Sequence, residues 1–302
     1  MTTAVPHVSV CICTYQRPLL LKRLLSELAR QDTDGQFTYS VVVADNDLAQ
    51  SAKDVVFTFA GVLSLPVTYC VETEQNIALA RNAALQNATG DYVAFLDDDE
   101  WPEGDWLRKL YEACERFQAD GVLGPVKPRF EEEPPAWVRK GRFYERPTHP
   151  TGFVIDWNEG RTGNLLLRKR ILAGVSLPFR PEFGSGGEDR DFFRRMIAAG
   201  CVFIWCDEAV AYEVVPSIRW KRSFLLRRAL LRGKASLSHR SSRVAPTVRS
   251  LAAIPLYAVA LPFAFFGGQH RFMDCLIRLC DHLGRVLGLL GLNPIKENYI
   301  TE

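Results

Sequence analysis

The amino-terminal half of the chain alternates between short apolar runs and amphipathic stretches. Buried strands are predicted at residues 8–13, 39–44, 67–71 and 92–97, where most residues are apolar and no charged residue occurs before Asp97. Apolar side chains recur at helical spacing over 19–28 and 76–85, between these runs. Alternating strands and helices with short connections predict a doubly wound α/β sheet, in which the carboxyl ends of the parallel strands meet at one edge.

After residue 105 the pattern is less regular. An amphipathic helix is predicted over 106–117, and the charged, loop-rich segment 131–150 is interpreted as an insertion. Further strands are expected at 163–167, 201–205 and 209–215. Glycines at 184, 186 and 187 predict a flexible loop before a helix that begins at Glu188.

From residue 216 onward the chain changes character. Apolar side chains at helical spacing are interspersed with arginines, and residues 251–266 contain no charged residue. That run is short for a full membrane span of about 20 residues, and two prolines interrupt it. We therefore predict a domain of residues 1–215 followed by a helical region, 216–302, that lies in or dips into an anionic membrane face. A helical core packed on the sheet is the alternative.

Composition and charge add to this picture. The 302 residues are 47% hydrophobic and 24% charged, enough for one large α/β domain with an appendage. The net charge of +2 hides a segment, 214–273, that has eleven Lys and Arg residues and no Asp or Glu. This segment predicts an anionic membrane surface, and not nucleic acid, as the partner.

The eight cysteines form no close CxxC pair, and no signal segment precedes the first strand, so we expect a cytoplasmic location.

Acidic residues follow the strand predicted at 92–97. Asp97, Asp98 and Asp99 stand at its carboxyl end, and Glu100 comes next. Like charges this close repel one another unless a divalent cation or a well-solvated turn compensates them. Because Asp97 and Asp99 are alternate residues, their side chains can point the same way. The spacing indicates a metal site, and the alternative is a solvated acidic loop.

In their order and spacing, several short motifs resemble those of the family 2 glycosyltransferases of the GT-A fold, over residues 1–235. The motifs are Cys13-Thr14-Tyr15-Gln16-Arg17-Pro18, Asp45, Asn76-Ile77-Ala78-Leu79-Ala80-Arg81-Asn82, Asp97-Asp98-Asp99, Gly163-Asn164 and Gly187-Glu188-Asp189-Arg190-Asp191. The resemblance implies a nucleotide-binding half-sheet, a DxD motif that holds Mn²⁺ or Mg²⁺ on a diphosphate, and a catalytic base from a Glu-Asp pair. It also implies a bacterial, membrane-associated type of enzyme.

The resemblance assigns roles to residues of this chain. The implied base is Asp189, with Glu188 beside it, and the implied metal ligands are Asp97 and Asp99. The implied contacts to the nucleotide sugar are Thr14, Tyr15, Arg17, Asp45, Arg81, Asp97 and Asp98. The chain departs from the family where a histidine often completes the metal shell, since Tyr212-Glu213 stands there and Glu213 is the candidate third ligand. It departs again in having Asp45-Asn46-Asp47-Leu48 after the second strand.

Structural roles remain open for the same residues. Asp45 can form an Asx turn, and Arg81 can form a surface salt bridge. Glu188 and Asp189 can be acids favoured at a helix amino terminus.

The function predicted from the sequence is that of an inverting glycosyltransferase of the hexosyltransferase type. It transfers sugar from a nucleoside-diphosphate donor, with UDP preferred, to a lipid-linked or polysaccharide acceptor at the cytoplasmic face of the cell membrane, as a peripheral or monotopic protein. The loop-rich insertion is expected to face the acceptor. The alternatives are a nucleotidyltransferase, which usually needs a Gly-rich, lysine-bearing loop that residues 13–18 do not provide, and a non-catalytic scaffold that binds nucleotide sugars at the membrane.

Overall fold

The structure, a computed structural model, describes residues 5–62, 65–184, 186–236 and 244–292. Contacts divide the chain into two compact units. The first contains the residues up to Lys127 together with Arg146–Glu213, and the second contains Pro128–Glu145 and the chain from Val214 onward. The functional division into 1–215 and 216–302 stays a prediction.

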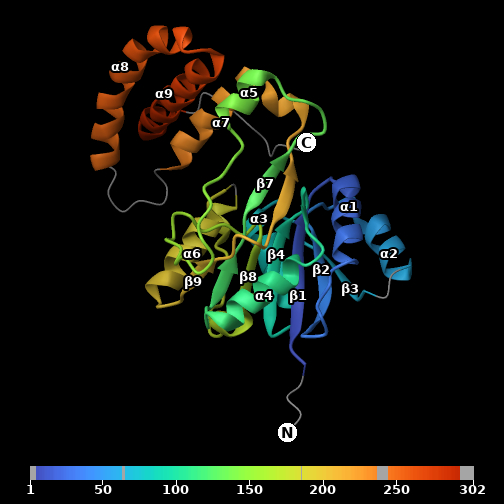
Figure 1. Cartoon of the computed structure of the whole chain (residues 1–302). Helices are drawn as coiled ribbons and strands as arrows, with labels where there is room; N and C mark the ends of the chain where they lie inside the picture. The colour runs from blue at the N-terminus through green and yellow to red at the C-terminus, as the bar shows by residue number, and fades with distance from the viewer. Residues whose placement is uncertain (1–4, 63–64, 185, 237–243, 293–302) are drawn as a thin grey trace. The chain divides into compact units, whose positions relative to one another are not determined.

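A mixed sheet forms the centre of the first unit (Figure 1). Within the described residues its strands lie in the order β3 (Val67–Val71), β2 (Thr38–Asp45), β1 (His7–Thr14), β4 (Tyr92–Asp97), β8 (Leu165–Arg168), β6 (Gly121–Leu123) and β9 (Phe203–Trp205). The first four strands are mutually parallel. Strand β8 runs antiparallel to both of its neighbours, and β6 and β9 are parallel. The predicted doubly wound, mixed α/β sheet is confirmed.

Helices cover both faces of this sheet because the side chains of a strand alternate between its two sides. Val10 and Ile12 of β1 join a core with α1 (Pro18–Leu28), α2 (Lys53–Val62) and α4 (Trp106–Arg116). Cys11, between them, joins a second core with α3 (Ile77–Asn87) and α6 (Glu188–Ala198). Since both faces of the inner strands are buried, those strands are mostly apolar on both faces, which is why they could be recognised.

Strand register aligns the polar ends of three strands. Thr14 of β1 pairs with Asp45 of β2, and Cys13 pairs with Asp97 of β4. The loops that follow these strands therefore begin at the same edge of the sheet.

A smaller sheet lies next to the acidic loop. It consists of β5 (Glu100–Pro102), β10 (Ala211–Val214) and β7 (Val126–Arg129). Strands β5 and β10 are antiparallel, with Glu213 opposite Glu100. The strand predicted at 209–215 thus brings Glu213 to the acidic loop.

Short helices occupy several connections. The loop-rich interpretation of 131–150 is wrong in part, because α5 (Ala136–Gly141) forms there. Three 3₁₀ helices, η1 (Lys169–Leu172), η2 (Pro181–Phe183) and η3 (Ser217–Trp220), complete the connections of the described chain.

The second unit contains α7 (Arg222–Ala235), α8 (Val244–Phe266) and α9 (Gln269–Leu289), and both α7 and α8 pack along α9. Two glycines let the backbones of α7 and α9 approach closely. A Cβ atom on Gly233 would lie 2.1 Å from the carbonyl oxygen of Asp281, and one on Gly284 would lie 2.1 Å from that of Leu230. Of the basic residues predicted to face the membrane, Arg240 and Arg243 lie outside the described residues.

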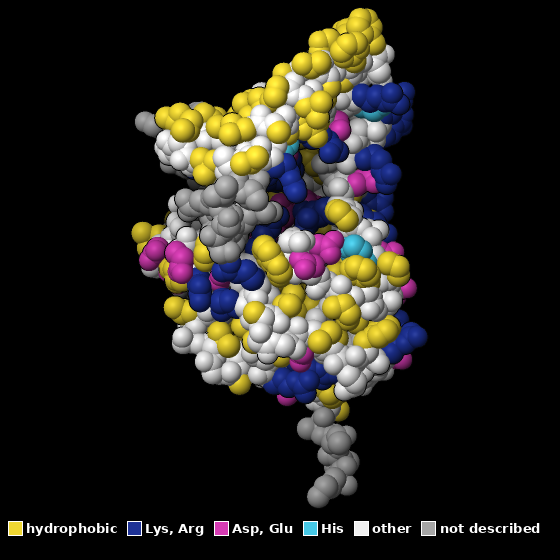
Figure 2. Space-filling model, turned by 90° about the vertical axis from the view of Figure 1, so that its left-hand side faces the viewer, with side chains coloured by type: hydrophobic (Ala, Val, Ile, Leu, Met, Phe, Trp, Pro, Cys, Tyr) yellow, Lys and Arg dark blue, Asp and Glu magenta, His cyan; other side chains and the backbone are white. Residues whose placement is uncertain are grey.

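Helix α8 corrects the expectation of a short, interrupted apolar run. It begins before residue 251 and continues through Pro255 and Pro262. Its segment Thr247–Phe266 has 20 residues, sufficient in length and composition to cross a membrane, and only 6% of it is buried. Figure 2 shows hydrophobic side chains gathered on the surface of the part of the molecule where Figure 1 places α8. The helix lacks the burial of a core helix.

Polar side chains of α3 fix the chain that leads into α6. Asn76 caps α3 by accepting a hydrogen bond from the Ala78 backbone N–H (3.0 Å), and its Nδ2 donates to the Pro181 carbonyl (3.0 Å). Asn82 forms a reciprocal pair with Phe179, donating to its carbonyl (2.7 Å) and accepting from its N–H (3.0 Å). The amino end of α6 is therefore held against α3.

We expect Asn82→Ala to lower the free energy of unfolding by about 1–3 kcal/mol, because it leaves the buried N–H and C=O of Phe179 without their partner. Urea unfolding measures this effect. Asn87→Ala is the matched control, since the exposed Asn87 amide donates only to a carbonyl of its own helix. Equal losses for the two variants would contradict the anchoring role.

Candidate active site

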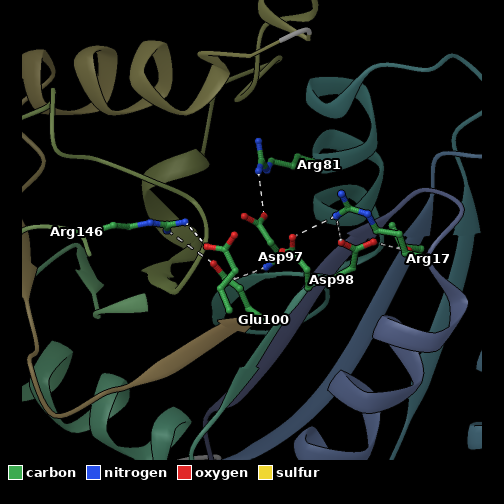
Figure 3. Close-up of polar contacts among 9 residues, drawn as sticks. Arg17, Arg81, Asp97, Asp98, Glu100 and Arg146 are labelled. Atoms are coloured by element: carbon green, nitrogen blue, oxygen red, sulfur yellow. Dashed lines mark hydrogen bonds and ion pairs between the residues drawn. The ribbon is translucent and has the colours of Figure 1, made fainter. Parts of the chain in front are cut away.

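Charged side chains from four parts of the chain meet at the carboxyl edge of the central sheet (Figure 3). The acids come from β4, the turn after it and the start of β5. Arg17 comes from the loop after β1, Arg81 from α3 and Arg146 from the connection after α5.

The loop after β1 is tied to the turn after β4. Asp98 is buried, and its Oδ2 accepts a hydrogen bond from Thr14 Oγ1 at 2.8 Å. Its Oδ1 accepts from Arg17 Nη1 at 2.9 Å, and the same nitrogen lies 3.4 Å from Asp99 Oδ2. Burial raises the pKa of Asp98, and the positive charge of Arg17 opposes that rise. The structure thus brings Thr14, Arg17 and Asp98 together, and Tyr15 lies partly exposed in the same loop.

Arg81 joins the acidic turn to the start of α6. Its buried guanidinium donates through Nη1 to Oε1 of Glu188 and through Nη2 to Oδ1 of Asp97, at 3.3 Å. Burial raises the pKa of Glu188, and the positive charge of Arg81 opposes that rise. The Oε2 atom of Glu188 is buried and has no hydrogen-bond partner among the described residues. The interaction is therefore a buried bridge, not the surface salt bridge that the sequence left open.

The third arginine, Arg146, was not predicted. Its Nη2 donates to Glu213 Oε2 at 2.6 Å, and its Nη1 lies 4.0 Å from Glu100 Oε1. Glu100 is buried, and its Oε2 accepts from the Asp97 backbone N–H at 3.3 Å. Burial and the charge of Asp97 raise the pKa of Glu100 well above its ordinary value, against the influence of Arg146. In the sequence, Arg146 follows other basic residues in a charged loop, and no spacing distinguishes it from them.

The crowding of acids is strongest at Asp99. Burial is the largest cause of a rise in its pKa from 3.8 to about 7, and the negative charge of Glu213 is the next largest. Gly163 closes the cluster on another side. A Cβ atom there would lie 2.7 Å from Glu100 Oε1 and 2.9 Å from Asp97 Oδ2, so the acids pack directly on its backbone.

The acids at the start of α6 have different surroundings. Asp189 is partly exposed, and its Oδ1 accepts a hydrogen bond from the Arg190 N–H at 2.7 Å. Asp191 is buried and bonded to Arg195 Nε at 2.8 Å, with Arg180 and Arg194 each 3.6 Å away. Of these two aspartates, Asp189 is the one with solvent access. Gly187, before the helix, has a left-handed φ of 102°, and Ser185 of the predicted flexible loop lies outside the described residues.

Comparison with known proteins decides the family. The model of the family described as glycosyl transferase family 2 matches residues 9–170. The succinoglycan biosynthesis protein ExoM of Rhizobium meliloti is 34% identical over 298 residues, covering 96% of this chain and 95% of that protein. The chain belongs to the family 2 glycosyltransferases.

Solved structures similar to this glycosyltransferase confirm its GT-A fold. The mannosyltransferase PcManGT of Pyrobaculum calidifontis, in complex with GDP-Man and Mn²⁺, aligns with a TM-score of 0.65 at 20% identity, covering 96% of this chain and 88% of that one. S. aureus TarS 1–349 in complex with UDP aligns with a TM-score of 0.55 at 18% identity, covering 97% of this chain and 94% of that one.

In this glycosyltransferase the carboxylate of Asp45 holds the turn after β2. Its Oδ1 accepts from the Asp47 N–H (3.1 Å), and its Oδ2 accepts from the Ala52 N–H (2.9 Å) and the Tyr69 hydroxyl (2.8 Å). This is the Asx turn that the sequence left open. A contact between Asp45 and a nucleotide stays a prediction.

The acidic cluster of the glycosyltransferase suits a hard cation in its chemistry. Among the described residues, no three His, Cys, Asp or Glu side chains are already gathered as a metal cage. Asp97, Asp99 and Glu213 nevertheless offer only oxygen donors, and Asp99 carries the raised pKa of a carboxyl among like charges. Oxygen-only ligands of this kind fit Mg²⁺ or Mn²⁺.

Asp99 makes the stability of the metal-free glycosyltransferase depend on pH. A carboxyl whose pKa is raised on folding stabilises the fold while it is protonated, and this contribution is lost as the pH rises from about 4 to about 7. The amide that replaces the carboxyl in Asp99→Asn stays neutral. We therefore expect the free energy of unfolding of this variant to fall less steeply over this interval than that of the wild type, with slopes that differ by up to about 1.4 kcal/mol per pH unit. Urea unfolding in EDTA between pH 5 and 7.5 tests this, and an unchanged pH slope would contradict it.

Proposed function

We propose that this protein is an inverting, metal-dependent hexosyltransferase. It takes sugar from a nucleoside-diphosphate donor, with UDP as the preferred nucleotide, and transfers it to a lipid-linked or saccharide acceptor at the cytoplasmic face of the cell membrane. The observation that carries the proposal is the bridge through Arg81. It joins the acidic turn, suited to a metal diphosphate, to the Glu188-Asp189 turn, which offers a base.

The names of similar proteins support the substrate class. The PcManGT structure is named as a complex with GDP-Man and Mn²⁺, and TarS structures are named as complexes with UDP and with UDP-GlcNAc. Apart from Mn²⁺, these ligands are a nucleoside diphosphate or nucleoside-diphosphate sugars. The name of ExoM, which refers to succinoglycan biosynthesis, supports a role in polysaccharide assembly.

The residues take separate roles in this proposal. Asp97, Asp99 and Glu213 hold Mn²⁺ or Mg²⁺, which when bound offsets the charge that develops on the departing diphosphate. Thr14, Tyr15, Arg17, Asp45, Arg81 and Asp98 surround the nucleotide sugar, either by direct contact or by holding the loops that contact it.

Asp189 takes the proton from the acceptor hydroxyl as that oxygen attacks the anomeric carbon. Attack on the face opposite the departing diphosphate inverts the configuration at that carbon. Arg81 holds Glu188 in place beside the base and Asp97 beside the donor.

We also propose that residues 1–215 form the catalytic domain and that 216–302 associate with the membrane. Exposed apolar side chains on α8, among them Leu256, Val259 and Phe263, occur in a basic segment. Each Lys or Arg near an anionic lipid surface contributes about 1 kcal/mol to binding. A membrane-bound transferase would have ready access to a lipid-linked acceptor.

Nucleotide release tests the catalytic proposal. UDP-, GDP- and dTDP-sugars are incubated with Mn²⁺, with Mg²⁺ or with EDTA, in the presence of membrane lipid. We expect release from a UDP-sugar that EDTA abolishes. With that donor and membrane lipid as the source of acceptor, Asp189→Asn should bind donor normally but transfer at least about a hundredfold more slowly, because it lacks the base.

Glu182→Gln, at an exposed position shortly before α6, is the control for this experiment and should retain full turnover. Undiminished transfer by Asp189→Asn would show that Asp189 is not the catalytic base. Activity in EDTA would end the metal proposal, and donor binding without any turnover would favour the scaffold.

Flotation with anionic liposomes tests the role of α8. Replacing Leu256, Val259 and Phe263 together by Gln should reduce the membrane-bound fraction at least about tenfold at low salt, since three exposed apolar side chains are lost. Leu19→Gln alters an equally exposed leucine on α1 and should have no effect. If the wild-type protein stays unbound, or the triple variant floats as well as the wild type, α8 has no membrane role.

A further inference from the structure

A pocket of about 290 Å³ lies in the first unit, where strands β6 and β9 end. Leu123 from the end of β6 and Trp205 from the end of β9 form part of its wall, together with Ile155. These three side chains are buried. None of the residues assigned above to donor, metal or base lines this pocket.

The pocket adjoins the acidic cluster. Gly163 and Arg146 line the pocket and also belong to the cluster, Gly163 through its backbone contact with Glu100 and Asp97 and Arg146 through its ion pairs. Figure 3 shows Arg146 extending toward Glu100. A molecule held in the pocket would therefore have one end beside the acids proposed to hold the donor.

Polar groups in the pocket are held in fixed positions. His149 Nε2 lies 3.0 Å from Glu159 Oε1, and the His149 ring stacks on Phe153 with centroids 4.2 Å apart and planes within 5°. Trp205 meets the same ring edge to face at 5.7 Å. The His149 contact engages only Oε1 of Glu159, so Oε2 can accept a hydrogen bond from a ligand.

This lining suits a sugar ring better than a phosphate. A pyranose has apolar C–H faces that pack on apolar and aromatic walls, and hydroxyl groups that donate to carboxylates. The Glu159 carboxylate would repel an anion. Of the two arginines in the lining, Arg146 is already paired with Glu213, and Arg161 is exposed to solvent. The volume lies just below the roughly 300–1,000 Å³ of typical small-molecule sites, which favours a small ligand such as a monosaccharide unit.

We propose that this pocket binds the saccharide end of the acceptor, with Glu159 accepting a hydrogen bond from one of its hydroxyl groups. The inference rests on the proposed function and deepens it. Because Gly163 places the pocket beside the acidic cluster, a sugar bound there would direct its nucleophilic hydroxyl toward the donor. His149 is a positioning residue that orients Glu159.

Saturation-transfer NMR with methyl β-D-glucopyranoside, methyl β-D-galactopyranoside and cellobiose, each with and without UDP and Mn²⁺, tests binding directly and needs no turnover. We expect at least one of these saccharides to bind the wild-type protein. Glu159→Gln should weaken that binding about tenfold or more, since it removes a charged acceptor, with unchanged affinity for UDP.

Glu112→Gln, on the outer surface of α4, is the matched control and should bind as the wild type does. Thermal unfolding verifies that each variant is folded. His149→Phe, which removes the group that orients Glu159, replaces Glu159→Gln if the latter does not fold, and weaker saccharide binding is expected. Three results would overturn the proposal: no saccharide binds the wild type, the pocket variant binds as tightly as the wild type, or it loses UDP affinity instead.

Saccharide binding without nucleotide release from any donor would support the pocket and reject the transferase. Turnover with membrane lipid that Glu159→Gln leaves unaltered would reject the pocket and leave the transferase in place. The failure of each proposal is therefore recognised separately.

Discussion

Mutual repulsion among buried carboxylates is the constraint around which this site is built. Asp98 and Glu100 are almost completely shielded from water, Asp99 is largely buried, and Asp97 beside them is partly exposed. Removing a carboxylate from water is costly unless an opposite charge is near, and the cost grows when its neighbours are also negative. Three arginines meet this demand, and each comes from a different part of the chain.

Neutralising the acids also draws those parts together. Arg17 brings in the loop after β1, Arg81 brings in α3 and through it the start of α6, and Arg146 brings in the wall of the neighbouring pocket.

The positive charge supplied by the arginines is incomplete. Asp99 still has a pKa near 7, and Oε2 of Glu188 is buried without a partner. A fully compensated cluster would be more stable but would have no attraction left for a ligand. The remaining imbalance lies where the proposed metal and the proposed base would act. In this respect the site sacrifices some folding stability, which is common where catalytic groups are held in position.

The sequence predicted the central sheet and the acidic edge because both depend on local patterns. Strands β1, β2 and β4 are mostly apolar and end in polar residues, so their direction and shared edge followed from the chain itself. Thr14, Arg17 and Asp98 could be grouped for the same reason. Arg146 could not be predicted, because its importance comes from Glu213, 67 residues away, and only the fold brings the two together. The role of Asp45 in its turn was left open, since an Asx turn and a ligand contact need the same residue at the same strand end. The full length of α8 was not predicted, because the charge-free run 251–266 covers only part of the helix, which begins at Val244 and continues through both prolines.

The contact between α7 and α9 limits how this chain can vary over evolutionary time. At Gly233 and Gly284 even a methyl group would overlap a carbonyl of the facing helix, so no other amino acid can be substituted without separating the two helices. The exposed positions of α8 have no such contact, since only 6% of the segment Thr247–Phe266 is buried. Homologous chains should therefore lose recognisable similarity in α8 first and keep these two glycines longest. A pair of glycines at this separation, after a GT-A domain, would then identify distant relatives in which the residues of α8 no longer align.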